Sequence, residues 1–289
     1  MRYRITHTTT YHYSASVRLR PHILRLCPRS DGSQWLRAFD ISLSPQPSQQ
    51  TYWLDANGTT CLQIGFDAPV NALHIQSISE VVTTRKNPFD YLTEPWAVQF
   101  PMDYPSSVAA QLRHYWEMPL GSGVDDAIAP DILDLARHLK QEANNNVGYF
   151  LTRLVQLIPQ RCDYQQRLEG DPYSPAITLA KKEGTCRDFT VLFVAVCRAV
   201  GLAARFVSGY QEGDLESDAP HDLHAWAEVY VPGGGWRGFD PTLGLAVGDR
   251  HVAIAAAVDP KQAAPVSGTL QPGQSVKTTF ESNISLKSL

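Results

Sequence analysis

Three residues that could together break an acyl bond occur in order along the second half of the chain. Cys186 lies in the run GTCRDF (residues 184–189), directly ahead of an apolar stretch that is typical of a buried helix. His224 and Asp240 follow at the ends of two short strand-like segments. A thiolate can act as a nucleophile, an imidazole as its general base, and a carboxylate as the group that orients the imidazole.

The position of Cys186 favours a reactive thiol. A cysteine in the first turn of a helix feels the positive end of the helix dipole, which stabilises the thiolate. Backbone N–H groups at the same place can receive the oxyanion of a tetrahedral intermediate. The ordinary alternative is a small buried apolar residue, which describes Cys197 inside the apolar run better than Cys186, whose neighbours at 181–183 and 187–188 are charged.

Strand register decides whether His224 can meet Asp240. The segment that begins with His224 and the segment that ends with Asp240 are separated by PGGG, so we expect an antiparallel hairpin. If Val231 pairs with Gly235, Asp240 lies opposite Trp226 and shares a face with His224, at ~7–8 Å between backbones. Pairing shifted by one residue would turn the carboxylate away. We therefore predict an odd-numbered loop or a bulge here.

Composition excludes several classes of protein. The 289 residues suffice for one large domain or two ordinary ones, and an apolar fraction of 43% can supply a sizeable core. A net charge of -4 without a basic cluster argues against nucleic-acid binding. The five cysteines have no C-x-x-C spacing, so neither a disulfide framework nor a zinc site is expected.

The chain also lacks the signals of export and of membrane insertion. Its N-terminus has no apolar h-region, and no stretch approaches the ~18 unbroken apolar residues of a membrane helix. We therefore predict a cytoplasmic protein with no membrane contact and no cofactor.

The first hundred residues have the pattern of a β-sandwich. Apolar and polar residues alternate over 3–17, and further strand-like runs cover 36–43 and 73–84. Asn57-Gly58 between two more such runs predicts a tight hairpin. We assign residues 1–100 to an N-terminal antiparallel β-sandwich domain.

Prolines after residue 87 mark a change to helical periodicity. We assign 101–130 to a linker with a short helix, 131–250 to an α+β core, and 251–289 to a C-terminal tail that either adds a strand to the N-terminal sheet or frays. The expected helices cover 127–141, 147–158 (ended by Pro159), 174–182 and 187–200, and the expected strands cover 204–210, 224–231 and 236–240.

Four motifs resemble the core of the transglutaminase-like superfamily. They are GTCRDF (184–189), ARFVSGY (204–210), HAWAEV (224–229) and GWRGFDPT (235–242). With YRITHTTTYHY (3–13), the chain is similar to bacterial transglutaminase-like proteins that are described as cysteine proteases and carry an N-terminal β domain. The resemblance implies a papain-like core in which Cys186 is the nucleophile, His224 the base and acid, and Asp240 the orienting residue.

The resemblance also implies a side-chain donor for the oxyanion, upstream of the cysteine. Tyr164, Gln165 and Gln166 are the candidates, although a plain polar loop is the ordinary interpretation of each. Trp226 could wall a substrate groove or pack the hairpin, as could Trp236. The acidic residues between 214 and 222 fit a solvated rim better than a calcium loop, and no metal site is expected.

These inferences support three functional hypotheses. The first is hydrolysis of a peptide or isopeptide bond through a Cys186 thioester, with transfer to an amine or peptide ligation as the alternative outcome of the same chemistry. The second is a binding module that uses the same fold without turnover. The third is an enzyme whose N-terminal β domain selects a protein partner.

Overall fold

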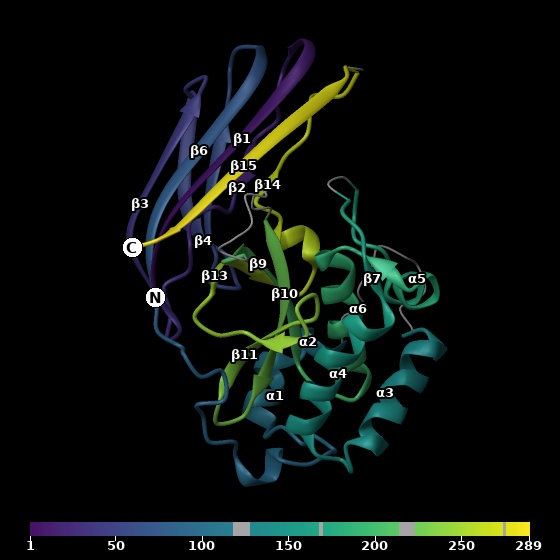
Figure 1. Ribbon diagram of the computed structural model, residues 1–289. Helices are drawn as coiled ribbons and strands as arrows, with labels where there is room; N and C mark the ends of the chain where they lie inside the picture. The colour runs from purple at the N-terminus through teal and green to yellow at the C-terminus, as the bar shows by residue number, and fades with distance from the viewer. Residues whose placement is uncertain (118–127, 168–169, 214–222, 274–275) are drawn as a thin grey trace.

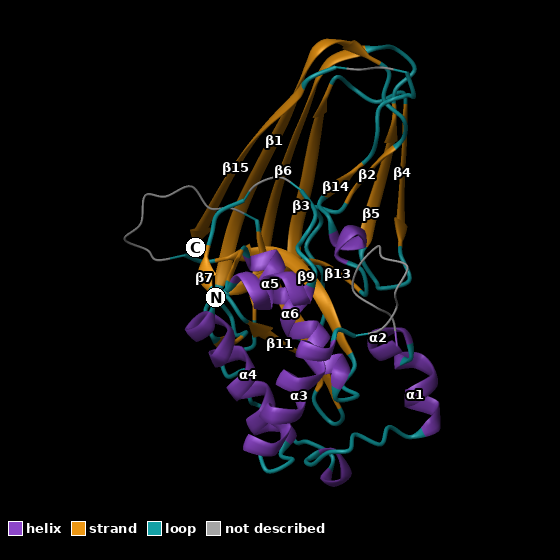
Figure 2. Cartoon of the chain, turned by 90° about the vertical axis from the view of Figure 1, so that its right-hand side faces the viewer, coloured by secondary structure: helices purple, strands orange, loops and turns teal. Residues whose placement is uncertain are grey.

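The alternating N-terminal run forms one long strand, β1 (Arg2–Val17), in a computed structural model that describes residues 1–117, 128–167, 170–213, 223–273 and 276–289. β1 is the second strand of a four-stranded sheet with the order β15-β1-β6-β3. A second sheet, β14-β2-β5-β4, faces it. The two sheets enclose an apolar core, so the predicted sandwich is present (Figure 2).

The sandwich uses strands from both ends of the chain. Its other N-terminal strands are β2 (His22–Leu24), β3 (Gln34–Ser44), β4 (Gln49–Leu54), β5 (Thr60–Gly65) and β6 (Val70–Thr83). The C-terminal segment supplies β14 (Val266–Ser267) and β15 (Thr278–Ser288), one to each sheet. β15 runs antiparallel to β1 across the front of the molecule in Figure 1. The tail therefore adds a strand, which was the first of its two expected arrangements.

The core consists of a five-stranded sheet with helices against one face. The strand order is β12-β11-β10-β9-β13, with bounds β9 (Ala204–Gln211), β10 (His224–Val231), β11 (Gly235–Asp240), β12 (Leu245–Ala246) and β13 (His251–Ala257). The central helix α6 (Cys186–Ala199) packs on β9 and β10 and is flanked by α3 (Pro130–Glu142), α4 (Val147–Arg161) and α5 (Pro175–Lys181). This arrangement confirms the α+β fold class.

Shorter elements connect these layers. They are η1 (Pro95–Ala97), α1 (Ser106–Leu112), α2 (His114–Glu117), η2 (Pro260–Ala263) and a two-residue parallel bridge between β7 (Asp163–Tyr164) and β8 (Glu183–Gly184). Among the described residues, no helix is long and apolar enough to span a membrane.

Two boundaries differ from those expected. α4 continues to Arg161 instead of ending before Pro159. A proline removes only its own N–H bond, and the following turn still closes because the Cys162 amide donates to the Ile158 carbonyl at 2.9 Å. The core sheet also extends beyond residue 250, because β13 is its fifth strand and is buried along its whole length.

Buried contacts fix the sandwich against the core. Tyr3, Ile5 and Ile284 share an apolar cluster with Cys186 and Phe206. The sandwich and the core are therefore packed together through apolar side chains. This contact places the β15-β1-β6-β3 sheet beside the start of α6.

A buried ion group joins the same two parts. Glu228 on β10 meets Arg29 of the sandwich and Arg205 on β9, each at 2.6 Å. Burial alone would raise the pKa of Glu228, but the two guanidinium groups lower it to about 2. The ionised carboxylate thus ties Arg29 to the central strand of the core sheet.

Candidate active site

A capped helix start holds Cys186. Thr185 and Asp188 form a reciprocal capping box, in which Asp188 Oδ2 accepts from the Thr185 amide at 2.7 Å. The same buried carboxylate accepts from Arg167 at 2.8 Å and from the Tyr173 amide at 2.6 Å. Gly184 allows this approach, because a Cβ there would lie 2.8 Å from Asp188 Cβ. Cys186 is thus the first residue of a rigidly anchored helix.

The β10–β11 hairpin has the register predicted from the sequence. Val231 pairs with Gly235 around a three-residue turn, and Ala227 pairs with Phe239. Gly233 and Gly235 have φ angles of +84° and +70°, which explains why the turn needs glycines. The odd loop turns the last residue of β11 toward the first residue of β10.

Asp240 and His224 consequently meet. Asp240 Oδ2 lies 2.7 Å from His224 Nε2, and the carboxylate is fully buried. Cys186 lines the same cavity as this imidazole, and its thiol helps to raise the pKa of His224. Because Asp240 occupies Nε2, Nδ1 is the ring atom left for the sulfur.

The pKa of His224 favours the charged imidazole. Burial alone would lower the pKa of the imidazole, but the Asp240 carboxylate and then the Cys186 thiol raise it to about 10. Burial alone would raise the pKa of Asp240, but His224 and then His251 hold it well below its usual range. An imidazolium beside the sulfur stabilises the thiolate form of a cysteine.

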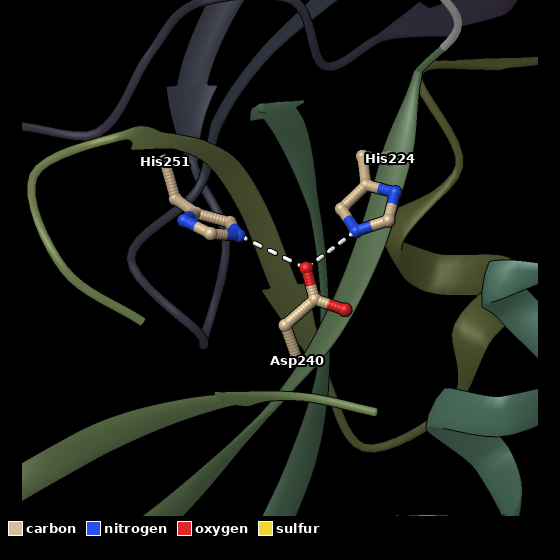
Figure 3. A group of neighbouring side chains, drawn as sticks. All are labelled: His224, Asp240 and His251. Atoms are coloured by element: carbon tan, nitrogen blue, oxygen red, sulfur yellow. Dashed lines mark hydrogen bonds and ion pairs between the residues drawn. The ribbon is translucent and has the colours of Figure 1, made fainter. Parts of the chain in front are cut away.

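His251 is a member of the group that the sequence did not reveal. It is the first residue of β13, and its Nε2 lies 3.0 Å from the same Asp240 oxygen, so the carboxylate lies between two imidazoles (Figure 3). Burial lowers the pKa of His251 despite its hydrogen bond to Asp240. A neutral His251 therefore donates a hydrogen bond that helps to keep Asp240 ionised.

The spacing of this group does not favour a metal ion. The ligand atoms of His224, Asp240 and His251 lie within 4.8 Å of one another. Their nitrogen–oxygen distances of 2.7 and 3.0 Å are those of hydrogen bonds. Two ligands of a tetrahedral zinc ion would be about 3.3 Å apart, given bonds of ~2.0–2.1 Å. We therefore interpret the cluster as an acid–base group.

Cys186 and His224 face a cavity of about 630 Å³ between the core and the sandwich. One wall belongs to the core and includes the start of α6 and of β10. The other comes from β1, β15 and the segment around η2. Residues of the second wall are His7, Thr9, Tyr11, Phe280, Ser282, Ala263 and Val266.

The predicted oxyanion candidates divide into two groups. Tyr164 and Gln166 line the cavity. The backbone N–H of Gln165, between them, donates to the Gly184 carbonyl at 2.8 Å. The β7–β8 bridge pairs Tyr164 with Gly184, two residues before the cysteine. Alternation along this extended segment directs residues 164 and 166 to the same side.

Trp226 does not wall a substrate groove. Its side chain is 1% exposed and packs edge to face on His251, with 5.2 Å between the ring centroids. Gly209 makes room for the indole, since a Cβ there would lie 2.5 Å from it. Trp236 packs on Tyr115 and under Arg205. Trp226 shares a face of β10 with His224 and packs against both His224 and His251, so it supports the histidines and does not line the cavity. The acidic residues 214–222 lie outside the described residues.

Comparisons with known proteins show which family the chain resembles. Residues 133–241 match the transglutaminase-like superfamily, and residues 3–82 match the bacterial transglutaminase-like N-terminal region. An uncharacterised protein of Mycobacterium tuberculosis is 28% identical over 289 residues, covering 93% of this chain and 87% of the relative. A protein-glutamine gamma-glutamyltransferase of Pseudomonas aeruginosa is 37% identical over 71 residues, which are 22% of this chain and 11% of that protein.

Among solved structures, a candidate cysteine protease from Cytophaga hutchinsonii has the same fold. It superposes with a TM-score of 0.74 at 21% identity, over 100% of this chain and 91% of that one. The resemblance inferred from the four motifs is thereby confirmed, for the core and for the N-terminal region alike.

Proposed function

The chain belongs to the transglutaminase-like superfamily, and from this premise we propose that it is a cysteine-dependent enzyme that cleaves an amide bond of a peptide or protein. Cys186 is the nucleophile, His224 the general base and acid, and Asp240 the orienting carboxylate. His251 is a positioning residue that acts through Asp240. No step requires a cofactor.

The first step forms a thioester. The Cys186 thiolate attacks the carbonyl carbon of the substrate amide, and the carbonyl electrons move to oxygen. The Cys186 backbone N–H, together with Tyr164 or Gln166, stabilises this oxyanion. The His224 imidazolium gives its proton to the leaving nitrogen, the carbon–nitrogen bond breaks, and an amine departs.

The second step releases the acyl group. Neutral His224 takes a proton from water, the resulting hydroxide attacks the thioester carbon, and the carbon–sulfur bond breaks to give a carboxylic acid. The products leave the thiolate and imidazolium in their starting states. Hydrolysis is favoured because polar side chains of the cavity, such as Thr9 and Ser208, offer hydrogen bonds to water.

One observation carries the proposal: Cys186 and the hydrogen-bonded pair His224–Asp240 meet at a cavity large enough for a peptide side chain. A binding module would not require a carboxylate buried behind a histidine that lies in the same cavity as a cysteine. A strongly perturbed acid–base pair at a cavity is typical of a functional site.

Transfer to an amine is the second candidate. It draws support from the local match to the gamma-glutamyltransferase of Pseudomonas aeruginosa. The thioester is common to both reactions, and only the acceptor differs. Exposing the protein to casein with a fluorescent primary amine separates them: covalent fluorescence on casein indicates transfer, whereas new carboxyl groups on casein without fluorescence indicate hydrolysis.

The decisive experiment is a search for an acyl adduct on Cys186. We expect mass spectrometry to find an acyl group on this residue after the protein is exposed to a peptide library, and to find none in Cys186→Ala. Iodoacetamide should modify Cys186 faster than the other four cysteines at neutral pH. Uniform slow labelling with no adduct would instead support the non-catalytic binding module.

We also propose a cytoplasmic location. The five cysteines are all free thiols in the structure, which suits a reducing compartment. Fractionation of cells into cytoplasmic and periplasmic extracts checks the location directly, and recovery in the periplasmic extract would contradict it.

A further inference from the structure

The strand β15 lies at the edge of its sheet. In the described part of the chain it pairs only with β1. The register has no bulge over Thr278–Ser288, and the strand contains no proline. Only Glu281 and Lys287 carry charge, so the usual protection of an edge strand is slight.

The ladder shows which backbone groups point outward. The Leu289 amide donates to the Arg2 carbonyl at 2.8 Å, and the Ser14 amide donates to the Lys277 carbonyl at 3.0 Å. In an antiparallel pair, hydrogen-bonded residues alternate with residues whose N–H and C=O point away from the partner. Odd-numbered residues of β15 therefore bond to β1, and even-numbered residues present N–H and C=O groups at the outer edge.

The same even-numbered residues face the candidate active site. Phe280 and Ser282 line the cavity that contains Cys186 and His224. Farther along this face, Ile284 is buried against the core. The face of β15 is thus covered by the core at Ile284 and borders the cavity at Phe280 and Ser282. Two residues combine a side chain in the cavity with unpaired backbone groups beside it.

We propose that the outer edge of β15 at Thr278–Ser282 binds an extended segment of the polypeptide substrate as an added strand. This inference rests on the proposed function, whose polypeptide substrate it describes more closely. The outward N–H and C=O groups recur at every second residue, about 6.8 Å apart. Another extended backbone has its donors and acceptors at the same spacing and can hydrogen-bond to them. Such a strand would direct every second side chain to the face that Phe280 and Ser282 share, and so into the cavity.

The proposal assigns a role to the N-terminal sandwich. Selectivity for backbone conformation comes from β15, whereas the side chains of β1 and β15 form the far wall of the cavity. The bound segment must be unfolded or extended, because a helix has no free backbone groups to offer. We therefore expect exposed tails and loops to bind, and compact folded domains to be rejected.

A proline at the edge tests the backbone contact. Ser282→Pro removes one outward N–H and leaves the ladder to β1 intact, because residue 282 does not donate to β1. Binding is measured in the Cys186→Ala background, by fluorescence anisotropy with labelled peptides from a tryptic digest of casein. We expect binding to weaken about fivefold to tenfold, the effect of losing one backbone hydrogen bond.

Two controls separate the backbone from other effects. Ser282→Ala removes the hydroxyl that contacts His7 at 3.3 Å but keeps the N–H, so it measures the loss of the side chain alone and should weaken binding less than Ser282→Pro. Ser288→Pro removes an outward N–H at the far end of β15 and should also bind normally. Equal binding by Ser282→Pro and Ser282→Ala would overturn the proposal.

A second measurement leaves the protein unchanged and so does not depend on the folding of a variant. One peptide that binds is N-methylated at single positions along its length. Added-strand pairing predicts that methylation weakens binding at alternate residues and is tolerated between them. Sensitivity without this alternation would overturn the proposal. Because binding is read in Cys186→Ala, absence of turnover in the parent protein would reject the proposed function without affecting this test.

Discussion

The two walls of the cavity hold histidines in opposite charge states. His224 on the core wall lies 2.7 Å from a carboxylate, and its pKa is raised to about 10. Among the described residues, the hydrogen-bond partners of His7 on the sandwich wall are the hydroxyl groups of Tyr210 at 3.0 Å, Thr9 at 3.1 Å and Ser282 at 3.3 Å. Burial lowers the pKa of His7 to about 4.

The difference teaches that burial alone does not decide the charge of a histidine. Burial opposes the imidazolium at both sites, but only His224 has an ionised partner that outweighs the desolvation cost. A buried carboxylate, itself supported by His251, keeps His224 charged on the core wall. His7 stays neutral at physiological pH, and the side chains of β1 and β15 shape the cavity through hydrogen bonds and apolar surface.

The largest expected effect is the loss of the nucleophile or its base. Cys186→Ser or His224→Ala should lower kcat/KM for peptide cleavage by about 10⁴-fold or more, because residues of a triad act as a unit. Cys197→Ala is the matched control on the same helix, and it should retain activity because Cys197 is fully buried. Retained activity in both nucleophile and base variants would place the chemistry elsewhere.

Replacing the Asp240 carboxylate should leave His224 uncharged, as His7 is on the opposite wall. In Asp240→Asn, burial dominates and the pKa of His224 falls toward that of His7, so we expect about a 10³–10⁴-fold loss of turnover. The wild-type imidazolium is present below its pKa and is lost as pH rises through about 10.

The upper limb of the pH profile tests this assignment. In Asp240→Asn it should move to lower pH, since the imidazolium is then lost earlier. The measurement is kcat/KM for peptide cleavage across the pH range, because cleavage needs the imidazolium to protonate the leaving nitrogen. An unmoved upper limb would mean that Asp240 does not set the charge of His224.

Removing the second imidazole should have a smaller effect. His251→Ala deletes one hydrogen bond to a charged acceptor, and a bond of this kind corresponds to about tenfold to a hundredfold in rate. We expect kcat to fall within that range while KM stays nearly constant. His251→Gln, which can still donate, should recover part of the loss; no recovery would indicate that the imidazole only fills space.

The smallest effect on turnover is expected at His7. His7→Gln should change kcat by less than about threefold, but it should alter the pH dependence of stability. The pKa of His7 is lower in the folded protein than in the unfolded chain. As pH falls from about 6.5 to about 4, the unfolded chain therefore binds a proton at His7 before the folded protein does.

The stability of the wild-type protein should therefore fall by about 3 kcal/mol more than that of His7→Gln over this interval. Chemical denaturation of both proteins at a series of pH values measures the difference. Parallel curves would show that His7 is already charged in the folded protein.

Local patterns in the sequence predicted much of the core wall of the cavity. The Thr185–Asp188 cap marks the start of α6, and the glycine-rich turn fixes the register that joins His224 to Asp240. Each of these signals lies within a few residues of the structure that it specifies. The alternation of β1 likewise assigned His7 to the buried face.

Features that depend on distant segments could not be obtained in this way. His251 opens HVAIAAA, a strand buried on both faces, which has neither the alternation of a half-buried strand nor a motif. Trp226 sits on the alternating strand beside His224, yet only the neighbouring Gly209 and β13 show that its ring points away from the cavity.

The sequence by itself determined which residues could react and how each is held by its nearest neighbours, because caps, turns and strand periodicity are short-range properties of the chain. Only the tertiary structure decided what surrounds them. It supplied the second imidazole behind Asp240, and it brought the two ends of the chain together as β1 and β15 opposite Cys186. Such contacts arise from burying apolar faces that lie far apart in sequence, and non-directional burial leaves no local pattern to read.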